Sequence, residues 1–342
     1  MEYLILDIGG SNLRAGRYCS ERNILVDEVY SKTDNYLVAD NKSQQQILEK
    51  LSNQCGEIGR GLFPTALPAG VVVGFPSPID QEGNCLAMPT LCGKTQIISR
   101  VCEFFLKNLW AYQVPTVLIN DVTAAGYRYL RSGIDFCIIT VGSGIGNKIF
   151  INGKQVVGVH GRGGEIGHLR IDNSVNALVC DCGEIGHLGG IASGRGALSF
   201  AKHCADKNRE QYNKSILSGQ SITTLSTEDL VEAFAADDAW TKEIISYSAS
   251  LLGQQIASIH LNLGIEDFVI VGGFAKALGD KYIEMLAFVA KQSCLDTGQD
   301  WLDYIKLGHQ DDRDGLIGGG IYAKQYFEVD LDRLRYKNTL LS

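Results

Sequence analysis

The sequence predicts an α/β protein of two lobes, and three observations lead to this fold class. The chain has 342 residues whereas typical domains have about 100–200, so we expect more than one lobe. Hydrophobic residues make up 45% and charged residues 20% of the chain, which is ample for a buried core and excludes disorder as the main theme. Strand-like apolar runs alternate with longer helical patterns, which is typical of α/β architecture.

The period of the apolar residues predicts the main elements in order. Short apolar runs predict strands at Tyr3–Ile8, Gly70–Phe75, Thr116–Ile119, Phe136–Val141 and Asp267–Val271. Longer stretches with helical spacing predict helices at Gln44–Gln54, Ile97–Trp110, Val122–Leu130, Lys242–Leu263 and Leu316–Phe327.

Three of the predicted strands run directly into a glycine-rich turn, at Asp7–Asn12, Gly142–Asn147 and Gly272–Phe274. After the first two turns another apolar run follows within a few residues, which predicts a strand–turn–strand hairpin. A Rossmann motif has a helix directly after its glycines, and a Walker P-loop has Gly-Lys-Ser/Thr after a strand. The pattern of the turns therefore argues against both of these nucleotide-binding motifs.

Composition and charge limit the binding partners and the cellular compartment that we expect for this chain. The net charge is −8 and no window is dense in Lys and Arg, so we expect no nucleic-acid or membrane partner. The stretch Gly61–Ile79 is uncharged but holds four of the six prolines, and it makes a poor transmembrane helix. The N-terminus lacks the pattern of a signal peptide. Among ten scattered cysteines only Cys180 and Cys182 lie close together, which favours the reducing cytoplasm.

The first two turns are candidate phosphate-binding sites. Asp7, at the end of a buried strand, could hold a water ligand of Mg²⁺, while Gly9 and Gly10 let backbone N–H groups approach phosphate oxygens. The turn Gly142-Ser143-Gly144 could cradle phosphate from the other side. Taken alone, each turn could equally be a plain hairpin.

An apolar strand ends at Asn120-Asp121, and a helix rich in small residues follows. A carboxylate at a strand end can accept the proton of a substrate hydroxyl, and Asn120 can hydrogen-bond a neighbouring hydroxyl. The simpler alternative is that Asp121 only caps the helix. On the residues alone, the cap is the favoured interpretation.

Four residues of metal-ligating type lie in one short stretch, namely His168, Cys180, Cys182 and His187. Two thiolates and two imidazoles suit tetrahedral Zn²⁺, and a site filled by four protein ligands would be structural. The alternative is a pair of buried free thiols. The four ligands together favour a zinc-binding loop at residues 165–190.

In this order and spacing, the motifs resemble those of the ROK family (repressor, ORF, kinase), which includes sugar kinases of the glucokinase and N-acetylmannosamine kinase type. The resemblance covers nearly the whole chain. It rests on the segments Asp7–Ser11, Gly74–Pro78, Asn120-Asp121, Gly142–Gly146, Gly164–His168, Cys180–Gly186, Val271–Gly273 and Gly318–Gly320.

The resemblance implies an actin-like ATPase fold (ribonuclease H-like, duplicated) with two lobes around a nucleotide cleft. The lobes would be residues 1–119 and 120–342, and the C-terminal helix could return to the first. The reaction would transfer the γ-phosphoryl group of ATP to a hydroxyl of a hexose or of an amino or N-acetyl hexose, with Asp121 as the general base. Homodimers are common in the family, so a homodimer is also expected.

The resemblance also implies binding residues. Mg²⁺ and ATP would be bound by Asp7, Gly9, Gly10, Ser11, Asn12, Gly142, Ser143, Gly144, Gly272 and Gly273. The sugar would be held by Gly74, Ser77, Asn120, Asp121, Glu165 and His168. The last of these would also bind zinc, so the zinc loop would shape the sugar pocket.

The sequence departs from the family pattern in the implied sugar pocket. The family reads Cys-x-Cys-Gly-x-x-Gly-Cys-x-Glu, whereas this chain has His187 at the third cysteine and Gly189 at the glutamate. His187 can still ligate zinc. Loss of the glutamate leaves room and removes a charge, so the acceptor can differ from glucose at that edge by a bulkier or differently charged group.

Three other interpretations compete with this one, and the sequence argues against two of them. The chain could be a sugar- or nucleotide-binding protein of the same fold that has lost turnover. A transcriptional regulator would carry a DNA-binding domain ahead of Asp7, for which we see no room. A filament protein or chaperone ATPase would not explain the zinc-type cluster or the Asn-Asp pair.

Overall fold

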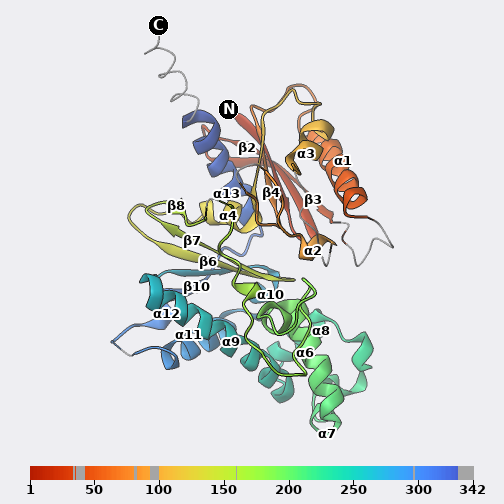
Figure 1. Cartoon of the computed structure of the whole chain (residues 1–342), viewed down its shortest axis with the longest axis vertical. Helices are drawn as coiled ribbons and strands as arrows, with labels where there is room; N and C mark the ends of the chain where they lie inside the picture. Colours follow the sequence, from red (N-terminus) through yellow and green to blue (C-terminus); the bar gives the residue numbers. More distant parts are fainter. Residues whose placement is uncertain are drawn as a thin grey trace. The chain divides into compact units, whose positions relative to one another are not determined.

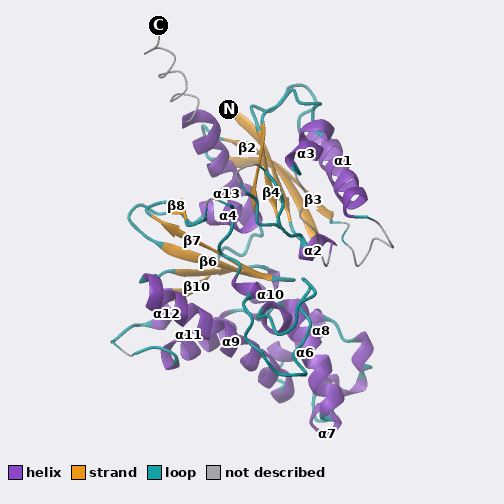
Figure 2. Cartoon of the chain, viewed as in Figure 1, coloured by secondary structure: helices purple, strands orange, loops and turns teal. Residues whose placement is uncertain are grey.

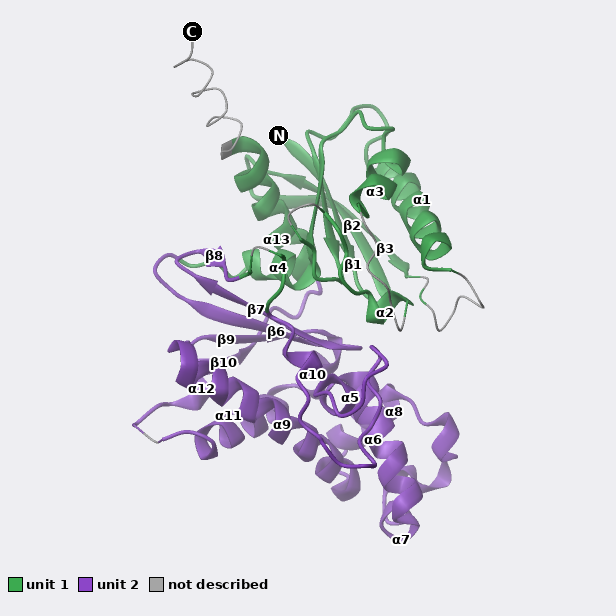
Figure 3. Cartoon of the chain, in the orientation of Figure 1, with its two compact units in different colours: residues 1–131, 157–163, 313–342 green, residues 132–156, 164–312 purple. Residues whose placement is uncertain are grey.

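The computed structural model describes residues 1–33, 35, 43–80, 83–92, 100–158, 160–295 and 297–329. Its contacts divide the chain into two compact units, which Figure 3 colours separately. Unit 1 holds residues 1–131, 157–163 and the chain from 313 onward, and unit 2 holds residues 132–156 and 164–312. This division lies later in the chain than the boundary expected after residue 119, because helix α4 (Asp121–Tyr127) packs within unit 1 against α13 (Asp314–Ala323).

Unit 1 is built on a five-stranded mixed sheet with the strand order β3-β2-β1-β4-β5. The strands are β1 (Glu2–Ile8), β2 (Asn12–Cys19), β3 (Ile24–Lys32), β4 (Val71–Phe75) and β5 (Thr116–Asn120). The first three pair antiparallel, and β4 and β5 run parallel to β1. The first glycine turn joins β1 to β2, so the predicted hairpin is confirmed.

Side chains alternate across the sheet of unit 1 and form two cores. Leu4, Leu6 and Ile8 pack on one face with α1 (Gln44–Leu62) and α3 (Cys102–Asn108). Tyr3 and Ile5 pack on the other face with α4 and α13. Figure 2 shows these helices on opposite sides of the strands, and the short helix α2 (Pro89–Cys92) near the strand ends.

Glycines permit two close helix contacts in unit 1. Helix α1 runs past the predicted end at Gln54, because at Gly56 it touches α3: an added Cβ would lie 2.2 Å from the carbonyl oxygen of Asn108. At Gly318 in α13, an added Cβ would lie 2.0 Å from the carbonyl oxygen of Ala124 in α4. The C-terminal glycine motif is thus a packing surface for α4. Beyond α13 the chain forms a π-helical turn, η4 (Lys324–Val329).

Unit 2 repeats the strand arrangement of unit 1, with the order β10-β9-β6-β7-β8. The strands are β6 (Phe136–Val141), β7 (Ile145–Ile151), β8 (Lys154–Gln155), β9 (Phe268–Val271) and β10 (Ile305–Leu307). Again three consecutive strands pair antiparallel, and two later strands add in parallel. The same topology in both units is the expected signature of a duplicated ribonuclease H-like fold.

Two groups of helices complete unit 2 (Figure 1). The sheet packs with α9 (Ala239–Leu263), α10 (Gly273–Leu278), α11 (Asp280–Gln292) and α12 (Trp301–Tyr304) in one hydrophobic core. A second core joins α6 (Gly194–Lys207), α7 (Arg209–Tyr212) and α8 (Thr227–Ala235) with the 3₁₀ turns η2 (Ile216–Gly219) and η3 (Ile222–Thr224). The remaining elements are η1 (Ile166–His168) and α5 (Gly189–Ala192).

The segment predicted as a helix at Ile97–Trp110 is helical only from Cys102 to Asn108, and its residues 97–99 lie outside the described part of the chain. No helix among the described residues combines the length and the apolar character that crossing a membrane requires.

Candidate active site

The carboxyl ends of three parallel strands bring the predicted unit 1 residues to one sheet edge. In the strand register, Asp7 of β1 lies beside Gly74 of β4, and Phe75 of β4 lies beside Asn120 of β5. An added Cβ on Gly74 would lie 3.6 Å from Cα of Asp121, so the start of α4 lies directly against β4. This edge is where open α/β sheets bind ligands.

Asn120 and Asp121 form a hydrogen-bonded pair at the start of α4. Asn120 is the N-cap: its Oδ1 accepts from the N–H of Thr123 at 3.1 Å. Its Nδ2 donates to Oδ1 of Asp121 at 3.1 Å. The same Asp121 oxygen accepts from the N–H of Val122 at 2.8 Å. The cap is therefore Asn120, not Asp121, and the Asp121 carboxylate is held in one orientation by two donors.

Ser77, two residues beyond β4, supports this pair. Its carbonyl oxygen accepts from Nδ2 of Asn120 at 3.2 Å, while its own hydroxyl is buried and donates to the carbonyl of Pro78 at 2.9 Å. The expected contacts of Ser77 and Asn120 with a sugar remain predictions. Both side chains already have partners inside the protein, and the side-chain amide of Asn120 contacts the Asp121 carboxylate directly.

The Asp7 carboxylate lies against the first turn of α13. An added Cβ on Gly315 would lie 2.3 Å from Cγ of Asp7, so only glycine leaves space for this carboxylate. Nη1 of Arg14, opposite on β2, lies 3.5 Å from Oδ2 of Asp7. A helix N-terminus stabilises negative charge. One carboxylate with waters and substrate phosphates is a common environment for Mg²⁺, so Asp7 fits the predicted role.

A buried ion pair fixes the start of α13 beside Asp7. Asp314, in the first turn of α13, accepts from Nη1 of Arg128 at 3.0 Å and from the hydroxyl of Tyr129 at 2.6 Å. The side chains of Asp314 and Arg128 are about nine-tenths buried. These residues were not singled out from the sequence.

The first glycine turn uses one of the N–H groups expected to meet phosphate. The N–H of Gly9 donates to the carbonyl of Asn12 at 2.9 Å and closes the hairpin. Oδ1 of Asn12 accepts from Nζ of Lys32 at 3.2 Å. The carbonyl of Gly10 accepts from Nδ2 of Asn35 at 2.7 Å. Phosphate contacts therefore remain a prediction for Gly10 and Ser11, whereas the N–H of Gly9 serves the turn itself.

The second and third glycine turns come together in unit 2, because β6 and β9 are parallel neighbours. Gly272 has φ +97°, and an added Cβ would lie 2.7 Å from the carbonyl oxygen of Val141, directly before Gly142. The N–H of Gly194, at the start of α6, donates to the carbonyl of Gly142 at 2.8 Å. An added Cβ on Gly142 or Gly273 would meet no atom within 4 Å. Open glycines beside a helix N-terminus suit phosphate.

Glu165 is paired with a buried cation that sequence reasoning missed. Nζ of Lys148 lies 3.0 Å from Oε1 of Glu165, and only 3% of the lysine side chain is exposed. Along β7 both Asn147 and Lys148 are buried. Two consecutive buried polar residues break the alternation expected of a strand, and their burial cannot be read from the sequence.

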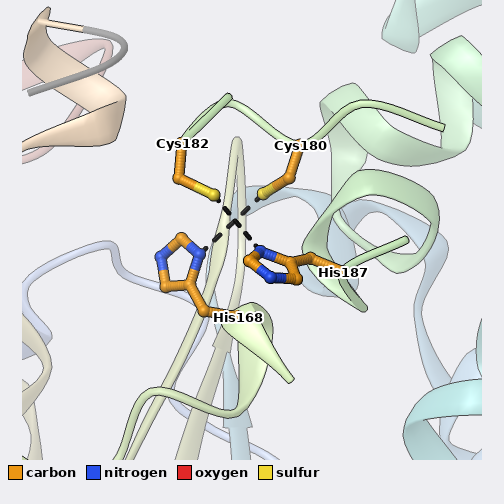
Figure 4. A group of neighbouring side chains, drawn as sticks. All are labelled: His168, Cys180, Cys182 and His187. Carbon is orange, nitrogen blue, oxygen red and sulfur yellow. Dashed lines mark hydrogen bonds between the residues drawn. The ribbon is translucent and has the colours of Figure 1, made fainter. Parts of the chain in front are cut away.

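The four predicted metal ligands converge in unit 2 (Figure 4). Their ligand atoms all lie within 4.8 Å of one another. Sγ of Cys180 lies 3.9 Å from Nδ1 of His168, and Sγ of Cys182 lies 3.2 Å from Nδ1 of His187. Around tetrahedral Zn²⁺, with bonds of about 2.0–2.3 Å, ligand atoms are about 3.3–3.8 Å apart, so the donor set fits this ion.

Protonation in the cluster depends on its burial. Burial raises the pKa of the Cys180 thiol, which disfavours a free thiolate. Burial, aided by the nearby His168, lowers the pKa of His187 and favours the neutral imidazole that a metal requires. A cation at the centre would stabilise the thiolates, so the binding of metal and the loss of protons are coupled.

The loop around the cluster is tied to neighbouring segments. Asp181, between the two cysteines, accepts from Nη1 of Arg195 in α6 at 2.8 Å. At Gly189, an added Cβ would lie 3.1 Å from the carbonyl oxygen of Gly167. The backbone at residue 189 is thus close to the turn that carries His168, and a larger residue there would require a small shift.

Comparison with known proteins agrees with this architecture. The model of the ROK family matches residues 3–326. The chain belongs to the ROK family. A C(7)-cyclitol 7-kinase of Streptomyces hygroscopicus subsp. limoneus is 33% identical over 338 residues, which cover 94% of this chain and 93% of that protein. A glucokinase of Halalkalibacterium halodurans is 29% identical over 218 residues, covering 62% of this chain and 64% of the relative.

Solved structures give the fold. A ROK family glucokinase from Streptomyces griseus, crystallised with glucose and AMPPNP, superposes with a TM-score of 0.75 at 21% identity. The match covers 95% of this chain and 100% of that structure. This ROK family member therefore has the actin-like ATPase fold, as its motifs predicted.

Proposed function

We propose that this ROK family chain is an ATP-dependent carbohydrate kinase that phosphorylates a hydroxyl of a polyhydroxylated ring. The observation that carries the proposal is the oriented carboxylate of Asp121 at the carboxyl edge of the unit 1 sheet. Oδ1 is held by the amide of Asn120 and by the N–H of Val122 at 3.1 and 2.8 Å. A carboxylate fixed in this way is suited to accept a proton from an acceptor hydroxyl.

Asp121 would act as a general base late in the reaction. Phosphoryl transfer proceeds through a loose transition state, so positioning and charge neutralisation supply most of the rate. Removal of the hydroxyl proton by a positioned base adds about 10²–10⁴ in rate. Asn120 would be a positioning residue. Its side-chain Nδ2 holds the Asp121 carboxylate, and its side-chain Oδ1 caps the helix that carries Asp121.

Nucleotide and metal would be bound by the glycine turns and by Asp7. In unit 1, Asp7 would hold Mg²⁺, and in unit 2 the turn at Gly142 and Gly272 would bind ATP. Bound Mg²⁺ supplies positive charge that offsets the charge on the phosphates. A structural zinc on the His168, Cys180, Cys182 and His187 cluster would stiffen the loop beside Glu165.

The acceptor would be a hexose, an amino or N-acetyl hexose, or a C7-cyclitol. Two observations put the cyclitol first. The C(7)-cyclitol kinase matches nearly its full length, whereas the glucokinase matches over 64% of its own. Gly189 also removes the acidic side chain that the family pattern has at this position, which alters one edge of the implied pocket.

The proposal is tested by coupled ADP release with Mg-ATP across hexoses, N-acetyl hexosamines, amino sugars and C7-cyclitols. Wild-type protein should show an acceptor-dependent rate, and Asp121→Asn should lose at least about 10²-fold of it while still binding ATP. A variant with the full rate would refute the assignment of the base. If no acceptor stimulates ADP release but thermal shift reports acceptor binding, the chain is a binding protein that has lost turnover.

A further inference from the structure

The buried side chain of Lys148 ends directly at Glu165. Nζ of Lys148 lies 3.0 Å from Oε1 of Glu165 and 3.4 Å from the carbonyl oxygen of Gly164. The lysine side chain is 3% exposed and that of Glu165 is 30% exposed. Lysines are almost never buried to this degree without a partner, because an unpaired buried charge is costly. The pair therefore places a fixed positive charge beside a carboxylate that solvent and ligands can reach.

The backbone on both sides of Glu165 is clamped to the same strand. Gly164 has φ +73°, and an added Cβ would lie 2.2 Å from the carbonyl oxygen of Asn147 and 3.0 Å from Nζ of Lys148. The N–H of Asn147 donates to the carbonyl of Gly164 at 3.1 Å. Oδ1 of Asn147 accepts from the N–H of Ile166 at 3.2 Å. The Glu165 carboxylate is therefore fixed through its backbone as well as by the lysine.

We propose that Lys148 determines acceptor specificity: it compensates the charge of Glu165, so that the site selects a neutral polyol over the same ring carrying an ammonium group. The inference rests on the proposed function and on the expected contact of Glu165 with the acceptor. A carboxylate without Lys148 would attract an ammonium group strongly. With Lys148 in place, an ammonium group that bonds to Oε1 of Glu165 also lies within about 6 Å of Nζ and is repelled by it.

A neutral hydroxyl gains from the same arrangement. It donates one hydrogen bond to an ionised carboxylate, an interaction stronger than a bond between neutral groups, and meets no repulsion from Lys148. Asp181, between the two cysteines of the adjacent metal loop, does not restore attraction for cations, because it is paired with Arg195 at 2.8 Å. Gly189, which packs against the Gly167 backbone, adds no charge to this segment.

The test compares matched rings in which one hydroxyl at a time is replaced by an amine. Kcat and KM are measured for wild type and for Lys148→Met, which keeps the apolar stem of the side chain. The ratio of kcat/KM for neutral over aminated rings should fall at least tenfold in the variant, a change of about 1.4 kcal/mol. The change should appear mainly in KM, because Lys148 is a positioning residue that acts through Glu165.

Two further variants separate specificity from folding. Lys148→Arg keeps the charge and should retain most of the discrimination. Lys148→Gln keeps a donor for the carbonyl of Gly164 but no charge, and it serves as the second neutral variant if Lys148→Met melts at a much lower temperature. Lys306→Met is the matched control: Lys306 on β10 pairs with the nearly buried Asp267 at 2.6 Å, and its loss should leave discrimination unchanged.

The outcomes separate this inference from the proposed function. Equal loss of kcat/KM on neutral and aminated rings in both neutral variants would show that Lys148 is only structural and would overturn the inference, while the kinase would stand. Wild-type protein that phosphorylates none of the rings would instead overturn the proposed function. A wild type that prefers aminated rings would also overturn the inference.

Discussion

Removing the Asn120 side chain should separate its two roles, because the cap and the contact with Asp121 use different atoms. In Asn120→Ala, α4 loses the bond from the N–H of Thr123, and both Asp121 and the Ser77 carbonyl lose an amide donor. In Asn120→Ser, a hydroxyl can still cap the helix, but the two amide bonds are absent. The pair of variants therefore distinguishes capping from orientation of the base.

The contacts of Asn120 give the expected losses of stability and of kcat in the two variants. Loss of an N-cap costs about 1 kcal/mol, and leaving the Ser77 carbonyl without its donor costs about 1–2 kcal/mol more. For a unit of this size, Asn120→Ala should lower Tm by roughly 4–12 °C. Asn120→Ser should recover about 2–4 °C of this loss through the cap. Kcat should fall about 10–100-fold in both variants, because the base loses one of the donors that orient it.

The assay is steady-state ADP release together with thermal melting of each variant. Asn208→Ala is the matched control, since Asn208 caps α7 in unit 2 through the N–H of Gln211 at 3.1 Å. It should lower stability slightly and leave kcat unchanged. Wild-type kcat in Asn120→Ser would refute the proposed orientation of Asp121. So would equal losses of kcat in Asn120→Ala and Asn208→Ala.

Three further changes test other parts of the site. Cys180→Ser should abolish binding of one zinc per chain and lower Tm. Cys204→Ser, at a half-buried cysteine outside the cluster, is the control and should change neither the zinc content nor Tm. Metal analysis measures the zinc content and thermal melting measures Tm. Gly272→Ala should destabilise unit 2 by about 2–3 kcal/mol and raise KM for ATP, because φ is +97° and a carbonyl lies 2.7 Å from the new Cβ. Gly264→Ala, at φ +68° with no atom within 4 Å, should cost about 1–2 kcal/mol and leave KM for ATP unchanged. Asp7→Asn should raise the Mg²⁺ concentration needed for half-maximal rate at least tenfold; an unchanged Mg²⁺ dependence would exclude Asp7 from the metal site.

The sequence predicted the fold well where local patterns determine it. Strand β6 has the predicted ends, and both glycine hairpins form as expected. The ends of α1 and α4 were predicted less well, because tertiary contacts decide them. The glycines at 56 and 59 do not end α1, since they lie where α3, β1 and Trp110 approach it closely. Helices α6 and α8 were not predicted, although each has a capping side chain.

The residues of the candidate site also differ in whether the sequence alone could predict them. The cluster of His168 with the two cysteines could be predicted, because ligand types and spacing are local properties. The contribution of Lys148 could not, since its burial depends on a segment that follows β7 by more than ten residues and folds back onto it. The cap of α4 was also misassigned by one residue. Adjacent Asn and Asp are both good caps, and only the backbone geometry distinguishes them.

The central claim is that this chain transfers phosphate to a ring hydroxyl with Asp121 as the base. The most direct test incubates the protein with Mg-ATP and a neutral C7-cyclitol or hexose and follows the products by ³¹P NMR and mass spectrometry. We predict a phosphomonoester of the ring in equal amount to ADP with wild type, and at least about 10²-fold slower formation with Asp121→Asn. ADP formed without any phosphorylated ring, or equal product from the variant, would contradict the account.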